Sequence, residues 1–234
     1  THGMCERGMG SAVGHNPDVI ETIVGWVMEA AEIPVIVKLT PNITDITRPA
    51  QAAKRAGADA ISMINTINSV TQVNLDRMVP EPYVAGKSTH GGYCGPAVKP
   101  IALNMLHACA ADPEVNLPIS GIGGISNWKD AAEFIALGAT SVQVCTAIMH
   151  YGFRIVEDMI DGLSDFLDSK GYASVNEMRG KAVKSVDKWE TLDLNYKRVA
   201  DINYDKCIGC NLCYIACEDG AHQAIDLISP EGKG

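Results

Sequence analysis

Short apolar runs alternate with helix-length segments along the first 170 residues of this chain, and this alternation limits the possible folds more than any other feature. The strand-like runs are four to seven residues long and cover residues 35–39, 58–64, 117–120 and 141–145. The helix-length segments cover residues 17–32, 46–56, 98–112, 128–137 and 152–170. Strands that alternate with helices predict βαβ units on a parallel sheet, and continuously apolar runs are typical of strands buried on both faces.

The predicted sheet is too small to be a complete barrel. A (β/α)8 barrel needs eight strands and typically about 250 residues, whereas only four strands are evident here. We therefore predict an α/β fold in which residues 1–170 form the C-terminal half of a (β/α)8 TIM barrel and residues 171–201 form a linker. Four strands without closure leave two sheet edges unpaired, so we expect that Thr1 is not the natural start of the protein.

A cysteine run near the C-terminus is the second constraint. Cys207, Cys210, Cys213 and Cys217 have the C-x2-C-x2-C-x3-C spacing of bacterial ferredoxins, whose thiolates bind iron–sulfur clusters. We predict that residues 202–234 form a ferredoxin-like 4Fe–4S segment, truncated because no second run follows. In two-cluster ferredoxins the fourth cysteine ligates the other cluster. The four cysteines therefore either hold one cluster among themselves or share ligands with a run that is absent here; zinc and disulfides suit this spacing less well.

Composition narrows the range of functions. The 234 residues carry a formal net charge of −9, and a nucleic-acid footprint would need a basic face that is not visible. No apolar run reaches the length of a membrane span, and no signal peptide opens the sequence. Eight cysteines, four of them in one cluster motif, suit a reducing compartment. We expect a cytoplasmic protein that moves electrons and contacts neither nucleic acid nor membrane.

The third and fourth strand ends predict a phosphate site. Chemistry in (β/α)8 enzymes takes place at the carboxyl ends of the strands, and the phosphate site commonly follows the last two. These ends are rich in glycine, which lets backbone N–H groups approach an anion, and a helix N-terminus beyond them favours negative charge. The alternative is a tight turn without a ligand. The predicted cradle consists of Gly123, Gly124, Ile125, Thr146 and Ala147.

The first two strand ends carry groups that suit a flavin. Lys38 lies in an apolar run, where a lysine is costly unless its charge is used. A cation beside a flavin ring stabilises the negative charge of its reduced form, although Schiff-base chemistry is a rival role for such a lysine. Asn42 and Asn65 offer amide groups that suit the edge of a nucleobase-like ring, or they cap turns.

A glycine-rich segment at residues 86–97 separates the second and third strands and is typical of an active-site lid. It includes Cys94, a thiol with no evident partner, whereas Cys109 falls on an apolar helix face and is expected in the core. No Gly-x-Gly-x-x-Gly fingerprint follows a strand, so the sequence does not indicate a dinucleotide site of that type.

The strand ends together resemble those of the dihydropyrimidine dehydrogenase family and, more loosely, those of dihydroorotate dehydrogenases. The resemblance covers nearly the whole chain, and the His2–Gly10 segment and the cysteine run favour the first family. Within it, the chain is similar to the FMN/iron–sulfur subunit of the bacterial NAD-dependent enzyme. The matching barrel segments are Lys38-Leu-Thr-Pro-Asn42, Ala58-Asp-Ala-Ile-Ser-Met-Ile-Asn-Thr66, Gly91-Gly-Tyr-Cys-Gly-Pro-Ala-Val-Lys-Pro-Ile-Ala-Leu103, Ile122-Gly-Gly-Ile125 and Gln143-Val-Cys-Thr-Ala147.

The resemblance implies FMN and 4Fe–4S clusters as cofactors, and it assigns roles to residues. Lys38 matches the strand lysine that contacts FMN, and Asn65 and Thr66 match the pair that holds the pyrimidine. The family's catalytic cysteine, which protonates the pyrimidine at C5, would be the residue just ahead of Thr1; Cys5 is the nearest thiol within the chain. The matches around the FMN ring and phosphate are Gly95, Gly123, Gly124, Ile125, Thr146 and Ala147.

The activity that the resemblance implies is the interconversion of uracil or thymine with 5,6-dihydropyrimidines. Electrons from NAD(P)H would arrive through a partner, an NAD-binding flavoprotein subunit with FAD and iron–sulfur clusters, in a homo- or hetero-oligomer. One alternative is a flavoenzyme similar to dihydroorotate dehydrogenase, which a substrate screen distinguishes. The other is a non-catalytic iron–sulfur electron-transfer subunit, which the absence of flavin from the purified protein would favour.

Overall fold

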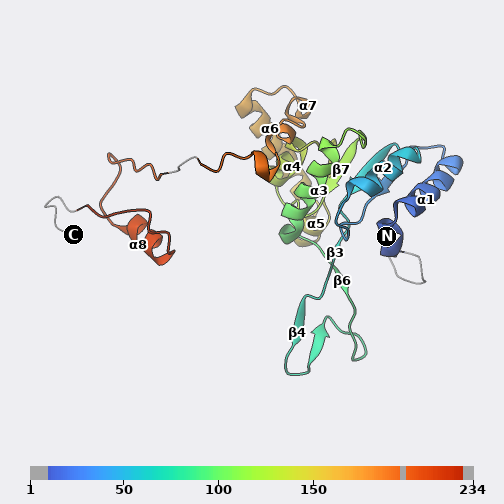
Figure 1. Ribbon diagram of the computed structural model, residues 1–234, viewed down its shortest axis with the longest axis horizontal. Helices are drawn as coiled ribbons and strands as arrows, with labels where there is room; N and C mark the ends of the chain where they lie inside the picture. The colour runs from blue at the N-terminus through green and yellow to red at the C-terminus, as the bar shows by residue number, and fades with distance from the viewer. Residues whose placement is uncertain (1–9, 196–198, 229–234) are drawn as a thin grey trace. The chain divides into compact units, whose positions relative to one another are not determined.

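The structure, a computed structural model, describes residues 10–195 and 199–228 (Figure 1). The chain divides into two compact units, Thr1–Val186 and Asp187–Gly234. The first unit contains a parallel sheet with its helices, and the second contains the cysteine run.

A parallel sheet of four strands lies at the centre of the described part of the first unit. Its order is β1 (Ile36–Lys38), β2 (Ala60–Met63), β7 (Ile119–Ile122) and β8 (Ser141–Gln143). These strands fall within or next to the four predicted runs, and each pair of neighbours is parallel. The predicted α/β architecture is therefore confirmed, with β1 and β8 as the edge strands.

The register of this sheet separates a polar row from an apolar row. Ile61 and Ile119 are paired in register and lie in the hydrophobic core, on the face where the helices pack. The expectation that the strands are apolar on both faces was wrong, because the other face carries hydroxyl groups and an amine. The in-register polar row consists of Lys38, Ser62, Ser120 and Ser141.

The longer helices are α1 (Pro17–Ala30), α2 (Thr47–Arg55), α3 (Lys99–Ala111), α4 (Trp128–Ala136) and α6 (Ile155–Lys170). Helices α2, α3 and α4 pack on the apolar face of the sheet, α1 packs on α2, and α6 packs on α4. Shorter helices are η1 (Gly10–His15), η2 (Pro96–Val98) and α5 (Thr146–Tyr151). The side chain of Asn127 caps α4 by accepting backbone N–H groups of its first turn. Leu106 from α3 and Phe134 from α4 are fully buried beneath the sheet.

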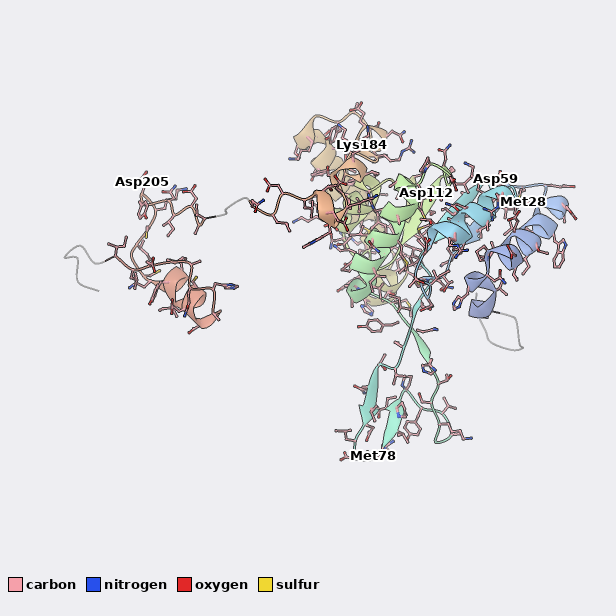
Figure 2. All side chains as sticks on the ribbon, in the orientation of Figure 1. Met28, Asp59, Met78, Asp112, Lys184 and Asp205 are labelled. Atoms are coloured by element: carbon pink, nitrogen blue, oxygen red, sulfur yellow. The ribbon has the colours of Figure 1, made fainter. Side chains whose placement is uncertain are left out.

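An arm of two antiparallel ladders interrupts the βαβ pattern between β2 and α3. β3 (Ile67–Ser69) pairs with β6 (Gly91–Tyr93), and β4 (Gln72–Asn74) pairs with β5 (Val79–Glu81). Figure 1 shows the arm projecting away from the sheet, and Met78 at its far end in Figure 2 is 76% exposed. The interpretation of residues 86–97 as an irregular lid was incomplete, because part of that segment is a strand.

The first part of the predicted linker packs on the first unit. α7 (Val175–Met178) lies within the predicted linker and buries Met178 against α4. The backbone N–H groups of Gly180 and Ala182 donate to carbonyl groups near the end of α4, and η3 (Val183–Ser185) follows. The division between the two units therefore falls after Val186.

The second unit contains η4 (Trp189–Thr191) and α8 (Leu212–Asp219). Cys207 and Cys210 precede α8, and Cys213 and Cys217 lie one turn apart on it. Across the described ranges, no helix is both long enough and apolar enough to span a membrane.

Candidate functional site

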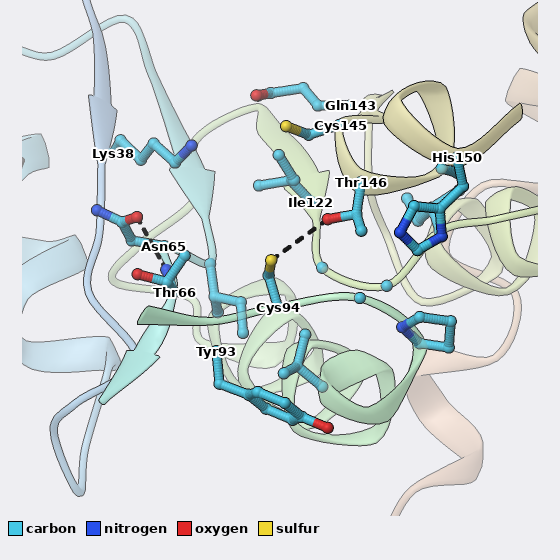
Figure 3. Close-up of a pocket in the computed structure, with 18 of the residues that line it drawn as sticks. Lys38, Asn65, Thr66, Tyr93, Cys94, Ile122, Gln143, Cys145, Thr146 and His150 are labelled. Carbon is cyan, nitrogen blue, oxygen red and sulfur yellow. Dashed lines mark hydrogen bonds between the residues drawn. The ribbon is translucent and has the colours of Figure 1, made fainter. Parts of the chain in front are cut away.

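A cavity opens at the carboxyl ends of the parallel strands, and Figure 3 shows the side chains around it. Its lining combines residues that are far apart in the sequence, because the four strand ends lie at one edge of the sheet. Every barrel residue predicted to bind cofactor or substrate lines this cavity; their roles remain predictions. They are Lys38, Asn65, Thr66, Gly95, Gly123, Gly124, Ile125, Thr146 and Ala147.

Hydrogen bonds hold the loop after β2 against the loop after β1. Asn42 Nδ2 donates to the Thr66 carbonyl oxygen at 3.1 Å, and Asn42 Oδ1 accepts the Asn68 N–H at 2.8 Å. The Thr66 N–H donates to Asn65 Oδ1 at 2.8 Å (Figure 3). Asn42 therefore joins the two loops and is not among the lining residues, whereas Asn65 and Thr66 line the cavity.

Lys38 lies at the end of β1, and Figure 3 shows it on the same side of the cavity as Asn65 and Thr66. Its side chain is exposed, and among the described residues it makes no hydrogen bond or ion pair. Because β1 is an edge strand among the described residues, the desolvation argument made from the sequence stays a prediction. The structure places the Lys38 side chain in the lining of the cavity.

The glycine-rich loop after β7 needs its glycines for two reasons. Gly123 and Gly124 have φ values of +145° and +77°, in the region that L side chains rarely adopt. A Cβ at Gly124 would also lie 2.7 Å from the carbonyl oxygen of Gly95, so the two loops touch through backbone atoms alone. Backbone N–H groups in such loops are suited to an anion.

A hydroxyl–amide network beneath the cavity was missed from the sequence. Gln143 Nε2 donates to Ser62 Oγ at 2.9 Å and to Ser120 Oγ at 2.8 Å, which connects three strands. Gln143 also lines the cavity. The signal was present, because strand alternation places Gln143 and Cys145 on the same face as Ser141, but the run was interpreted as uniformly apolar.

Two thiols also line the cavity. Thr146 Oγ1 donates to Cys94 Sγ at 3.3 Å, so Cys94 has the partner that the sequence did not reveal (Figure 3). Cys94 and Cys145 are exposed, whereas Cys109 is buried in the core as predicted. Burial raises the pKa of the Cys109 thiol to about 12. Tyr93 and His150 are further lining residues that sequence reasoning missed.

Alkylation should separate these thiols. At pH 8 Cys109 holds roughly a thousandfold less thiolate than a thiol of ordinary pKa, and the thiolate is the nucleophile. We expect iodoacetamide to label Cys94 and Cys145 in the native protein and FMN to slow that labelling, with Cys109 labelled only after denaturation. Mass spectrometry of the peptides measures all three rates, and native Cys109 labelling as fast as that of Cys94 would contradict the structure.

The cysteine run presents four thiols on a loop and a helix. Gly209 and Asn211 have φ values of +67° and +58°, which turn the chain sharply between the cysteines. Cys217 Sγ accepts the Ala224 N–H at 3.2 Å. Throughout the described ranges, no group of three or more His, Cys, Asp or Glu side chains lies close enough to hold a metal ion. The donors themselves, exposed or half-buried thiols, are of the type that binds iron–sulfur clusters.

The barrel cavity fits FMN by the chemistry of its donors. A lysine, amide groups and a hydroxyl offer polar partners for the ring edge, Ile64, Ile122 and Ile125 offer apolar walls, and the glycine loop offers backbone N–H groups for a phosphate. Cys5 and the rest of residues 2–9 lie outside the described residues, and the predicted acid cysteine lies outside this sequence.

Comparisons with known proteins agree with these assignments. The model of the dihydroorotate dehydrogenase family matches residues 7–167, and that of the 4Fe–4S binding domain matches residues 199–225. These matches support the expected FMN barrel and the expected 4Fe–4S segment.

Several curated relatives are similar to this chain. The NAD-dependent dihydropyrimidine dehydrogenase subunit PreA of Escherichia coli (strain K12) is 48% identical over 224 residues, which are 95% of this chain and 54% of the relative. The dihydropyrimidine dehydrogenase (NADP(+)), chloroplastic, of Arabidopsis thaliana is 42% identical over 78% of this chain and 44% of the relative. The dihydroorotate dehydrogenase B (NAD(+)), catalytic subunit, of Pyrococcus abyssi is 39% identical over 76% of this chain and 57% of the relative. The chain thus spans about half the length of the relatives that it matches.

Proposed function

The chain belongs to the dihydroorotate dehydrogenase family, and on that premise we propose that it is part of a dihydropyrimidine dehydrogenase. The proposed reaction interconverts uracil or thymine with the 5,6-dihydropyrimidine. The proposal rests mainly on one observation. The same chain contains a cavity whose donors suit FMN, lined by Asn65 and Thr66, and a 4Fe–4S binding segment. The similarity to two relatives named as dihydropyrimidine dehydrogenases supports the same reading.

The residues of the cavity divide into binding and electrostatic roles. Bound FMN would supply the hydride chemistry of the reaction. Asn65 would present its amide to the pyrimidine, and Thr66 would fix that amide through its N–H bond to Asn65 Oδ1. Lys38 would place positive charge beside the ring edge where negative charge develops on reduction. The glycine loop with Thr146 would hold the phosphate end, away from Lys38.

Electrons would reach the cavity through the second unit and a partner. We propose NAD(H) binding on a separate FAD/iron–sulfur flavoprotein subunit, because the sequence lacks a dinucleotide fingerprint. The names of two of the relatives, each a subunit of an NAD-dependent enzyme, favour such an arrangement. Reduction of uracil by NADH in the purified protein without any second subunit would contradict this part of the proposal.

A Lys38→Met variant tests the proposed site directly. We expect the rate of uracil reduction to fall about a hundredfold, because an electrostatic partner of the developing charge is removed. The midpoint potential of bound FMN should become more negative, because the reduced ring loses its cation. The measurements are stopped-flow uracil reduction and spectroelectrochemistry on protein expressed from its natural gene.

The matched control is Lys184→Met, an exposed lysine that does not line the cavity. It should leave both the rate and the potential unchanged. An unaltered potential in Lys38→Met would show that Lys38 does not lie beside the flavin.

Dihydroorotate is the second candidate substrate. The family match and the Pyrococcus abyssi relative, a dihydroorotate dehydrogenase B catalytic subunit, favour it. A screen that compares uracil, thymine and dihydroorotate decides, and turnover of dihydroorotate alone would replace the proposal made above.

A further inference from the structure

The glycine-rich loop of the cavity rests on the start of α3 without side chains between them. A Cβ at Gly124 would lie 2.9 Å from Lys99 Cβ and 3.0 Å from the Lys99 backbone nitrogen. The Val98 N–H donates to the Gly95 carbonyl at 3.1 Å, which turns the Gly95 loop directly into the helix. Contacts that hold the far end of this loop, residues 125–127, near α3 therefore support its position as well.

Asp130 on α4 holds that far end. Its Oδ2 accepts the Ser126 N–H at 2.8 Å, the Ser126 hydroxyl at 2.9 Å and the Asn127 amide at 2.9 Å. Its Oδ1 accepts Lys99 Nζ at 2.6 Å. Asp130 is 6% exposed, so one buried carboxylate joins the end of the loop to the helix on which the loop rests.

Lys99 completes this connection from the α3 side. Its ammonium contacts Asp130 and also Glu133 Oε2 at 2.9 Å, so it bridges α3 to two positions on α4. Neither Lys99 nor Asp130 is among the residues that line the cavity. Apart from the electrostatic effect of their charges, their influence on a ligand would act through the loop between them.

Both groups are charged at neutral pH. Hydrogen bonds to Asp130 and Glu133 raise the pKa of Lys99. Burial opposes ionisation of Asp130, but hydrogen bonds from Lys99 and Ser126 outweigh it and leave the pKa of Asp130 below its usual value. The ion pair is therefore intact between about pH 5 and pH 9, which makes it a permanent connection rather than a switch.

We propose that Lys99 and Asp130 are positioning residues that hold the 123–126 loop in its anion-binding shape and thereby make the cavity select a phosphorylated flavin. The inference rests on the proposed function, since it concerns the flavin of that site. It predicts that loss of the ion pair weakens binding of the phosphate end specifically. The isoalloxazine ring, held by other residues, should be affected little.

Comparing FMN with riboflavin isolates the phosphate end, because the two ligands share the ring. The experiment measures dissociation constants for both by flavin fluorescence quenching, using apoprotein prepared from the protein expressed from its natural gene. For Asp130→Asn and Lys99→Met we expect FMN affinity to fall about tenfold, as for other groups that position a ligand-binding shell, and riboflavin affinity to change less than about twofold. Lys99→Arg should keep most of the difference between FMN affinity and riboflavin affinity, because a guanidinium can still pair with Asp130.

A matched control uses another ion pair of the same unit. Arg55 pairs with Glu21 at 2.9 Å on the surface, away from the cavity, so Arg55→Met should leave both dissociation constants unchanged. Circular dichroism melts identify any variant that is unfolded at the assay temperature. Should Asp130→Asn fail to fold, Lys99→Gln decides the question, because it leaves Asp130 its bonds to Ser126 and Asn127.

The outcomes separate this inference from the function on which it rests. Equal weakening of FMN and riboflavin in folded variants, or no weakening of either, overturns the positioning role while the wild-type protein still binds FMN. Wild-type apoprotein that binds neither ligand overturns the proposed function together with the inference.

Discussion

A Gly124→Ala variant should lose FMN binding by at least about a hundredfold, since a displacement of about 1 Å in a positioned group is enough for an effect of that size. The added methyl group would meet the Gly95 carbonyl oxygen at 2.7 Å and Lys99 at 2.9 Å, and neither backbone can retreat without moving a wall of the cavity. The positive φ of +77° adds strain for any residue with a Cβ. We expect the free energy of unfolding to fall by about 2–4 kcal/mol.

Gly86→Ala is the control that separates conformation from contact. Gly86 has a φ of +79°, nearly that of Gly124, but a Cβ there meets nothing within 4 Å. It should show only the conformational penalty of about 1 kcal/mol and unchanged FMN binding. Flavin titrations and denaturant unfolding measure both effects. Equal losses in the two variants would mean that the close approach of the loops is not what the glycine provides.

Cys213→Ala should remove the iron–sulfur cluster of the second unit altogether. A thiolate ligand cannot be replaced by a methyl group, so we expect iron and acid-labile sulfide to fall by about four atoms each per chain. Visible absorbance near 400 nm should decrease with them, and NADH-driven uracil reduction should become undetectable, while FMN stays bound. Iron analysis, absorbance spectra and flavin content measure these outcomes separately.

Two further variants test whether the loss of iron is specific to the cysteine run and which ligand scheme applies. Cys94→Ser, which removes an exposed thiol outside the run, should leave the iron content unchanged. Cys217→Ala distinguishes the two ligand schemes: the same loss as in Cys213→Ala means one self-contained cluster, and loss of a different spectral component means a shared ligand. Full iron content in Cys213→Ala would contradict the assignment of the run.

The elements most easily predicted from the sequence were those with strong local signals. The four strand positions followed from short β-branched runs bounded by proline and glycine, and the long helices followed from the length of the intervening segments. The strand ends were then predictable as a group, because parallel strands in βαβ order place their carboxyl ends at one edge. This is why residues as distant as Lys38 and Thr146 were predicted together and line one cavity.

Elements without such signals were missed. The arm at residues 67–93 has strands of only three residues each, which is too short for an alternating pattern to be recognised, and β3 pairs with β6 more than twenty residues away. The helix α5 has six residues, too short for a periodicity to be recognised. The packing of residues 171–182 on α4, through backbone hydrogen bonds and the buried Met178, was likewise not predicted, because no local pattern indicates it.

The sequence by itself determined the order of strands and helices, the glycines that only a left-handed or closely packed backbone requires, and the spacing of the cluster cysteines. Each of these depends on local conformational preference or on covalent spacing. Only the tertiary structure decided that Gln143 reaches Ser62 and Ser120 and that Asp130 connects Lys99 to the glycine loop. These contacts depend on strand register and helix packing, which bring together side chains that the sequence separates by tens of residues.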